Sequence, residues 1–166
     1  LKGLWTRDDF SYVGSHFELK HASISPKPIQ QPHIPIYIGG ESEAGRSLAA
    51  RVADIYLFNG RPLNQVSPIL RDMIRRAESF DRNLSFGISA FVICRSTESE
   101  AKEEFLRLLE LKHMNIRGGD KHVSMHQSPS DEVKKVGTNG GTIAGLVGTP
   151  NQIAERIIEF ETLGIE

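Results

Sequence analysis

Short apolar runs alternate with helical patterns through the middle of the chain. Residues 34–38 form an apolar run that ends at Gly39 and Gly40, and a polar helix start follows over 43–52. A second run over 53–58 ends at Asn59 and Gly60, an amphipathic helix is predicted over about 67–79, and a third run covers 84–94. This alternation predicts an α/β fold with parallel strands. The pattern alone does not separate an open sheet from part of a barrel.

The sequence before these units predicts extended chain and not helix. Apolar and polar positions alternate over 10–24 around a turn at 13–16, which predicts a small β-hairpin. Four of the eight prolines follow within 26–35. Since proline disfavours helix, we expect a rigid connector there.

The last third of the chain combines two predicted helices with a long loop. Thr97 is placed to cap a helix that runs to about residue 111. Residues 113–145 are polar and glycine-rich, which is typical of a mobile or ligand-covering segment. Thr149 and Pro150 begin a final helix, and the expected buried stripe of that helix is formed by Ile153, Ile157 and Ile158.

We expect one domain over 1–166 and not two. Its expected parts are a hairpin and proline-rich connector (1–35), strand–helix units (36–112), an insertion loop (113–147) and a last helix (148–166). Gly164 is typical of a helix C-cap, and Ile165 would normally begin another strand. The domain is therefore expected to be incomplete.

Composition and charge narrow the classes of partner. With 39% hydrophobic and 25% charged residues and a net charge of −1, the chain gives no electrostatic reason to expect nucleic acid or a membrane as partner. No apolar run approaches the ~20 residues of a membrane span, and the first residues lack a signal-peptide layout, so we expect a soluble cytoplasmic protein that binds a small molecule. The single Cys94, inside the third apolar run, is expected to be a buried core thiol.

The glycine pair before the first helix is a candidate phosphate site. Backbone N–H groups at a helix N-terminus have no partner within the helix and carry a partial positive charge, so they attract phosphate. Gly40, Glu41 and Ser42 would form this cradle, with the Ser42 hydroxyl as an added donor. The alternative is a glycine pair that only turns the chain.

Six segments, spaced along the whole chain, resemble one enzyme family: LWT (4–6), SPKPIQ (25–30), PIYIGGES (35–42), AARVAD (49–54), FGI (86–88) and LVGTP (146–150). The chain resembles the bacterial luciferase-like flavin-dependent monooxygenases, and the alkanesulfonate monooxygenase branch is nearest. The resemblance implies the carboxyl-terminal half of a (β/α)8 TIM barrel, about strands 5 to 7 with their helices and an insertion.

The same resemblance implies a chemistry and its partners. Members of the family use reduced FMN (FMNH2) supplied by a separate NAD(P)H flavin reductase, and they oxygenate a small substrate, organosulfur compounds included, with O2. Glu41 and Ser42 match the family positions that meet the flavin phosphate, next to Gly40. Asn59 stands where alkanesulfonate monooxygenases carry a tryptophan beside the active site, so it is expected in the flavin or substrate pocket. A homo-oligomer is expected for the full-length protein.

The chain departs from the alkanesulfonate enzymes at three substrate positions. Ser89 and Phe91 replace an arginine and a histidine, and Asn139 replaces a loop arginine. A sulfonate anion needs cationic partners, so these losses favour a neutral substrate such as a sulfone, thioether, alkane or ketone. Gly140, in the same loop, suits a lid over the flavin. The alternatives are core packing for Phe91 and Ser89 and a plain surface loop for Gly140.

The sequence identifies no catalytic acid or base and no metal site. His122 and His126 are one helical turn apart, but no third ligand accompanies them at a diagnostic spacing. Two other functions stay open. One is a deazaflavin-dependent oxidoreductase of the same barrel family, and the other is a non-catalytic flavin-binding half-barrel with unpaired sheet edges.

Overall fold

The computed structural model describes residues 1–117, 135–137 and 140–166, with side chains outside 112–117. The chain divides into two compact units, Leu1–Ile36 and Tyr37–Glu166.

The first unit contains the predicted hairpin. After a short helix α1 (Lys2–Thr6), strands β1 (Phe10–Val13) and β2 (Glu18–Ala22) pair antiparallel. The Gly14 N–H donates to the Phe17 carbonyl at 2.9 Å and closes the turn. The residues that follow, up to Ile36, carry no helix or strand, which agrees with the proline-rich connector.

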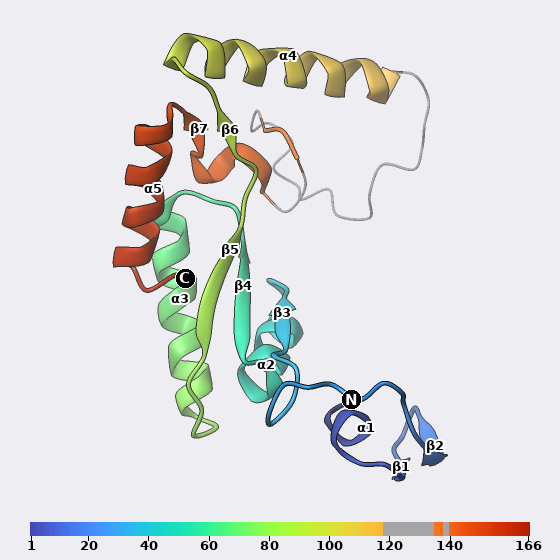
Figure 1. Cartoon of the computed structure of the whole chain (residues 1–166). Helices are drawn as coiled ribbons and strands as arrows, with labels where there is room; N and C mark the ends of the chain where they lie inside the picture. Colours follow the sequence, from blue (N-terminus) through green and yellow to red (C-terminus); the bar gives the residue numbers. More distant parts are fainter. Residues whose placement is uncertain (118–134, 138–139) are drawn as a thin grey trace. The chain divides into compact units, whose positions relative to one another are not determined.

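The second unit is built on a parallel three-stranded sheet in the order β3-β4-β5 (Figure 1). Its strands are β3 (Tyr37–Gly39), β4 (Ile55–Asn59) and β5 (Ser85–Ser89), and helices α2 (Glu43–Val52) and α3 (Leu63–Glu78) connect them. The predicted α/β alternation is confirmed, and α2 has the expected bounds. Because the strands are parallel, their carboxyl ends lie at the same edge of the sheet.

The core lies between one face of this sheet and the helices. Tyr56 and Phe58 on β4 are buried and pack as a T-shaped pair, with ring centroids 5.0 Å apart, and Phe86 on β5 stacks on Phe58. Alternate β4 positions, Ile55, Leu57 and Asn59, are only half-buried on the other face. The helices contribute small and flexible side chains to the same cluster: Ala49 and Ala50 from α2, and Val66, Leu70 and Met73 from α3.

Helix α3 begins earlier than predicted. It starts at Leu63, directly after Pro62, whereas the pattern placed its start near residue 67. Pro68 lies inside the helix on its exposed side, where it removes one backbone hydrogen bond without burying an unpaired group. The first turn is retained because Val66 is fully buried in the core.

The third apolar run is divided between two sheets, which corrects two predictions. β5 ends at Ser89, and β6 (Ile93–Cys94) pairs in parallel with β7 (Val147–Gly148) in a separate sheet. Cys94 is exposed, so the prediction of a buried core thiol is wrong. Successive strand residues face opposite sides, and it is Ile93 that is buried.

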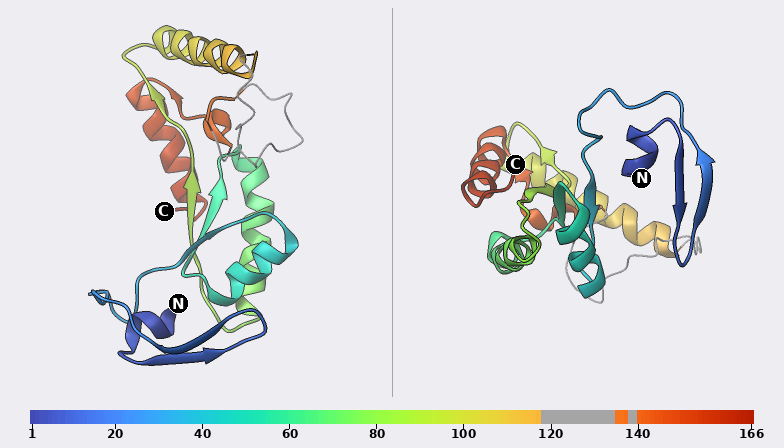
Figure 2. Two further views of the ribbon diagram at one scale, coloured as in Figure 1. Left: turned by 90° about the vertical axis from the view of Figure 1, so that its right-hand side faces the viewer. Right: turned by 90° about the horizontal axis from the view of Figure 1, so that it is seen from below.

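Beyond the carboxyl ends of β4 and β5 lie β6, β7 and helix α4 (Glu98–Arg117), as Figures 1 and 2 show. The Thr97 side chain accepts from the Glu100 N–H at 3.3 Å and the Glu100 carboxylate accepts from the Thr97 N–H at 3.0 Å, so the predicted cap is confirmed. The helix runs six residues past its predicted end. A short 3-10 helix, η1 (Gly141–Ala144), precedes β7.

The last helix, α5 (Pro150–Thr162), has the predicted cap but a narrower buried stripe. Thr149 and Gln152 form a capping box, with Pro150 as first helical residue. Ile153 and Phe160 are buried, whereas Ile157 is 51% exposed and Ile158 57%, so the predicted stripe is right only for Ile153. After α5 the chain returns to the sheet, where the Glu166 N–H donates to the Phe86 carbonyl at 2.8 Å. Within the described residues no helix has the length and apolarity needed to cross a membrane.

Candidate functional site

The carboxyl edge of the β3-β4-β5 sheet collects four of the predicted site residues. In the register of the sheet Asn59 lies beside Ser89, and Glu41 and Ser42 follow the end of β3. The Asn59 side-chain amide donates to Glu41 Oε1 at 2.8 Å, which joins the ends of β3 and β4. Parallel pairing thus brings Asn59 beside Glu41, 18 positions earlier in the chain, and beside Ser89, 30 positions later.

Ser42 is the N-cap of α2. Its backbone is extended (φ −65°, ψ 154°), and its Oγ accepts from the Gly45 N–H at 3.1 Å. The N–H groups of Glu43 and Ala44 have no acceptor within the helix because of their position in its first turn. Ser42 Oγ–H stays available as a donor. The arrangement supplies the set of donors that a phosphate needs.

Two glycines keep this helix start free of side chains. Gly40 has a φ of +153°, which favours glycine. A Cβ on Gly45 would lie 3.1 Å from Ser42 Oγ and 3.5 Å from the Gly40 backbone, so it would fill the space beside the cap. The two glycines therefore allow the Gly40 backbone to lie close to the first turn of α2.

Tyr56 holds this turn by a hydrogen bond to its backbone. Its ring is 1% exposed, and its hydroxyl donates to the Gly40 carbonyl at 2.8 Å. Burial raises the pKa of Tyr56, and the negative charge of Glu41 raises it further. The phenol therefore stays protonated and keeps its hydrogen bond over the whole neutral range.

Arg61 joins the cluster, although the sequence reasoning did not identify it. Its Nη2 donates to Glu41 Oε1, the same oxygen that accepts from Asn59. Its side chain is 21% exposed, and its Nε is buried with no hydrogen-bond partner among the described residues. A signal was present in the sequence, since Arg61 follows the polar end of a strand by two residues, where barrel enzymes carry their site residues.

The segment before β7 meets the same edge through Gly140. A Cβ on Gly140 would lie 1.8 Å from the Gly60 carbonyl oxygen, and its φ is +85°, so only glycine fits there. The Phe91 N–H donates to the Gly141 carbonyl at 3.2 Å, and the Phe91 ring lies against Gly137. Phe91 is 47% exposed, which argues against a core aromatic. Asn139 lies outside the described residues.

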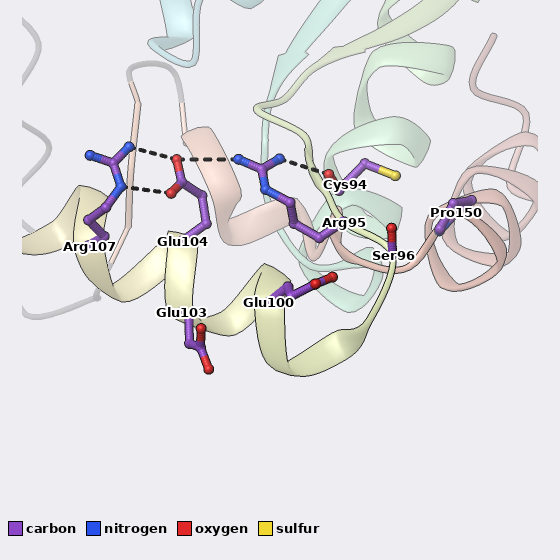
Figure 3. Close-up of a pocket in the computed structure, with 8 residues that line it drawn as sticks. All are labelled: Cys94, Arg95, Ser96, Glu100, Glu103, Glu104, Arg107 and Pro150. Carbon is purple, nitrogen blue, oxygen red and sulfur yellow. Dashed lines mark hydrogen bonds and ion pairs between the residues drawn. The ribbon is translucent and has the colours of Figure 1, made fainter.

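A surface pocket of about 720 Å³ lies between β6, α4 and the start of α5 (Figure 3). Glu104 lies between Arg107, at 2.7 Å, and Arg95, at 3.4 Å. The hydrogen bond from Arg107 lowers the pKa of Glu104. The lining is Cys94, Arg95, Ser96, Glu100, Glu103, Glu104, Arg107 and Pro150. It contains no predicted site residue.

Among the described side chains, those of residues 1–111, 135–137 and 140–166, no three His, Cys, Asp or Glu groups gather as metal ligands do. His122 and His126 lie outside the described residues.

The chain is similar to a known protein family and to curated proteins of known activity. The model of a family described as luciferase-like monooxygenase matches residues 1–166. The chain is 34% identical to an FMNH2-dependent dimethylsulfone monooxygenase of Pseudomonas putida and 32% identical to one of Pseudomonas fluorescens (strain Pf0-1), in both cases over 100% of this chain. It covers 49% and 48% of those proteins, so it spans about half the length of the curated relatives it matches.

The solved structures agree in fold. The chain superposes on a long-chain alkane monooxygenase with a TM-score of 0.64 and 24% identity, over 95% of this chain and 40% of that one. At this identity the likeness concerns the arrangement of helices and strands. The carboxyl edge described above is the part of that arrangement where the predicted cofactor residues lie.

Proposed function

Because the chain belongs to the luciferase-like monooxygenase family, we propose that the protein is an FMNH2-dependent two-component monooxygenase acting on a small neutral organosulfur substrate. As the resemblance implied, β3, β4 and β5 with their helices are part of a (β/α)8 barrel, and the described residues form no closed barrel. Bound FMNH2 would supply two electrons to O2, so that one oxygen enters the substrate and the other leaves as water. A separate flavin reductase would supply FMNH2, and the protein would be a homo-oligomer.

The observation that carries the cofactor assignment is the start of α2. Ser42 Oγ–H and the N–H groups of Glu43 and Ala44 are donors within one helix turn, and the glycines at positions 40 and 45 add no side chain beside them. A phosphate dianion fits this donor set. Both curated relatives are named FMNH2-dependent, which supports FMN as the phosphate carrier.

Asn59 and Ser89 border the same edge and would contact the flavin or the substrate. Asn59 holds the side chain of Glu41 and lies beside Ser89 in the sheet. Phe91 presents a half-exposed aromatic surface next to the segment that contains Gly140 and Gly141. These residues would position the substrate and exclude water, and none of them is assigned as an acid or base.

The chemistry of this edge supports a neutral substrate. Neither Ser89 nor Phe91 is charged, and the guanidinium of Arg61 is already engaged by Glu41. Among the described residues of this edge, a sulfonate would lose its hydration without gaining a free cation. Both curated relatives are named for dimethylsulfone, so a small sulfone is the first substrate to test.

The cofactor assignment is tested by anaerobic titration of the whole protein with FMNH2. Ser42→Asp keeps an N-cap side chain but adds a negative charge, so FMNH2 affinity should fall about 30-fold with little change in thermal stability. Ser42→Asn is the matched control, since it caps without charge and should retain affinity. Failure of the unaltered protein to bind FMNH2, or equal binding by the Asp and Asn variants, would overturn the assignment.

The substrate class is tested separately by following ¹⁸O from O2 into product. Turnover of dimethyl sulfone should give a product that contains ¹⁸O, whereas methanesulfonate should give no labelled product. Efficient turnover of methanesulfonate would overturn the neutral-substrate proposal and leave the flavin site intact.

A further inference from the structure

We propose that Arg61 and Asn59 are positioning residues that hold the Glu41 carboxylate at the end of β4 and thereby keep the start of α2 free for phosphate. The inference rests on the proposed function, because it concerns the same phosphate site. It gives Arg61 a role that the sequence reasoning did not find.

Glu41 is a competitor for the site that it borders. It immediately precedes the N-cap Ser42, and the first-turn amides of a helix attract a carboxylate for the same reason that they attract phosphate. A released Glu41 side chain would therefore compete for those donors. Its charge would also repel a phosphate dianion.

The structure directs this carboxylate elsewhere. Glu41 Oε1 accepts from Asn59 Nδ2 at 2.8 Å and from Arg61 Nη2, so two donors from the carboxyl end of β4 share one oxygen. The Gly45 N–H, which an acidic side chain could have taken, is bonded to Ser42 Oγ. The carboxylate is therefore engaged at β4, and Ser42 caps the helix.

The backbone on both sides of the interaction is fixed. Tyr56 donates to the Gly40 carbonyl, directly before Glu41. Gly60, directly before Arg61, packs closely against Gly140. A Cβ added to Gly140 would overlap the Gly60 carbonyl oxygen. Held in this way, Arg61 loses little conformational freedom when it binds Glu41.

Arg61 and Glu41 together add no net charge to the site. Removal of Arg61 therefore uncovers a negative charge beside the phosphate, whereas removal of both side-chain charges restores neutrality. This predicts that the two residues are coupled in FMN binding, and that the coupling depends on the phosphate of the ligand.

The test compares reduced FMN with reduced riboflavin, which lacks the phosphate, in anaerobic titrations of the whole protein. Arg61→Ala should weaken FMN binding about tenfold and leave riboflavin binding unchanged. The double variant Glu41→Gln/Arg61→Ala should return FMN affinity to within about threefold of the unaltered protein. Asn59→Ala should shift the FMN-to-riboflavin ratio in the same direction but by less, because Arg61 remains.

Arg82→Ala is a matched control. Arg82 is also mostly buried, at 24% exposure, and it donates to the Ala53 carbonyl at 2.6 Å and pairs with Asp54 at 3.6 Å, before β4 begins. Its loss should not alter the FMN-to-riboflavin ratio, even where it lowers stability. A merely structural effect of Arg61→Ala would likewise leave that ratio unchanged.

The outcomes separate cleanly. An unchanged FMN-to-riboflavin affinity ratio in Arg61→Ala would overturn the inference but not the proposed flavin site. A weakened FMN affinity that Glu41→Gln does not restore also overturns it, because Arg61 would then contact phosphate itself. Absence of FMN binding by the unaltered protein overturns the proposed function, and this inference with it.

Discussion

Two clusters of arginines and carboxylates in this protein use the same side chains in different ways. Between α2 and α3, Arg46 and Arg76 both donate to Asp72 Oδ2, at 2.9 and 2.8 Å, and Arg76 also bonds Glu43. At the carboxyl edge of the sheet, Arg61 shares one oxygen of Glu41 with the neutral amide of Asn59. The first cluster joins two helices, and the second joins two strand ends.

The difference lies in what each cluster borders. Burial alone would raise the pKa of Asp72, but the hydrogen bond and charge of Arg76, with Arg46 and Arg75, lower it, so the carboxylate stays ionised. Every partner in that cluster belongs to a helix packed on the core. That cluster reaches the first turn of α2 through Glu43, whose carboxylate is bonded to Arg76, whereas the cluster with Glu41 lies directly before that turn, at the ends of β3 and β4. Arginine–carboxylate interactions thus join two packed helices in one place and, in the other, border the site that we propose for phosphate.

The largest expected effect comes from Gly140→Ala, which tests the close packing at the carboxyl edge. The new Cβ would meet the Gly60 carbonyl oxygen in a backbone conformation that alanine disfavours. We expect a loss of about 3 kcal/mol in unfolding free energy, measured by denaturant titration, together with weaker FMNH2 binding.

Gly164→Ala is the control for that change. Its φ is similar, at +94°, but nothing lies within 4 Å of the added Cβ, so it should cost only about 1 kcal/mol. Equal losses in the two variants would mean that Gly140 does not pack against Gly60.

A smaller effect is expected from Asp72→Asn, which weakens the cluster between the helices. Loss of the charged acceptor should cost about 2 kcal/mol at pH 7 and leave FMNH2 affinity unchanged. A change in affinity comparable to that of Ser42→Asp would show that the two clusters are not separate in function.

The same variant should change the acid sensitivity of the protein. The lowered pKa of Asp72 means that its stabilisation is present above its unfolded pKa of about 4 and is lost as the pH falls through the folded value. Unfolding free energy measured from pH 7 to pH 2 should therefore fall less steeply below pH 4 in Asp72→Asn. Parallel curves would contradict the assigned role.

The smallest effect is expected from Tyr56→Phe, which removes only the hydroxyl beneath Gly40. One hydrogen bond between neutral groups is worth about 1 kcal/mol, so stability should fall by that amount. FMNH2 affinity should fall as well, and riboflavin affinity less, because the turn before Ser42 is loosened. Equal losses of affinity for FMNH2 and riboflavin would mean that Tyr56 stabilises the core and has no separate effect on phosphate binding.

Local signals predicted the framework of this fold well. Thr97 and Thr149 each cap the helix that follows them, as predicted, because a cap depends on atoms only three residues away. The pattern was less informative where packing decides. It did not show that Cys94, Ile157 and Ile158 are exposed. The apolar character of a residue does not indicate which elements of the fold cover it.

The sequence by itself determined the alternation of strands and helices from β3 to β5, the caps at Thr97 and Thr149, the family and the candidate cradle at Gly40, Glu41 and Ser42. These features depend on near neighbours or on a pattern spread along the whole chain. Only the tertiary structure decided that Arg61 binds Glu41 and that Gly140 lies on Gly60. Those contacts join residues 20 and 80 positions apart, and they arise because parallel strands end at a common edge, where loops from distant parts of the chain meet.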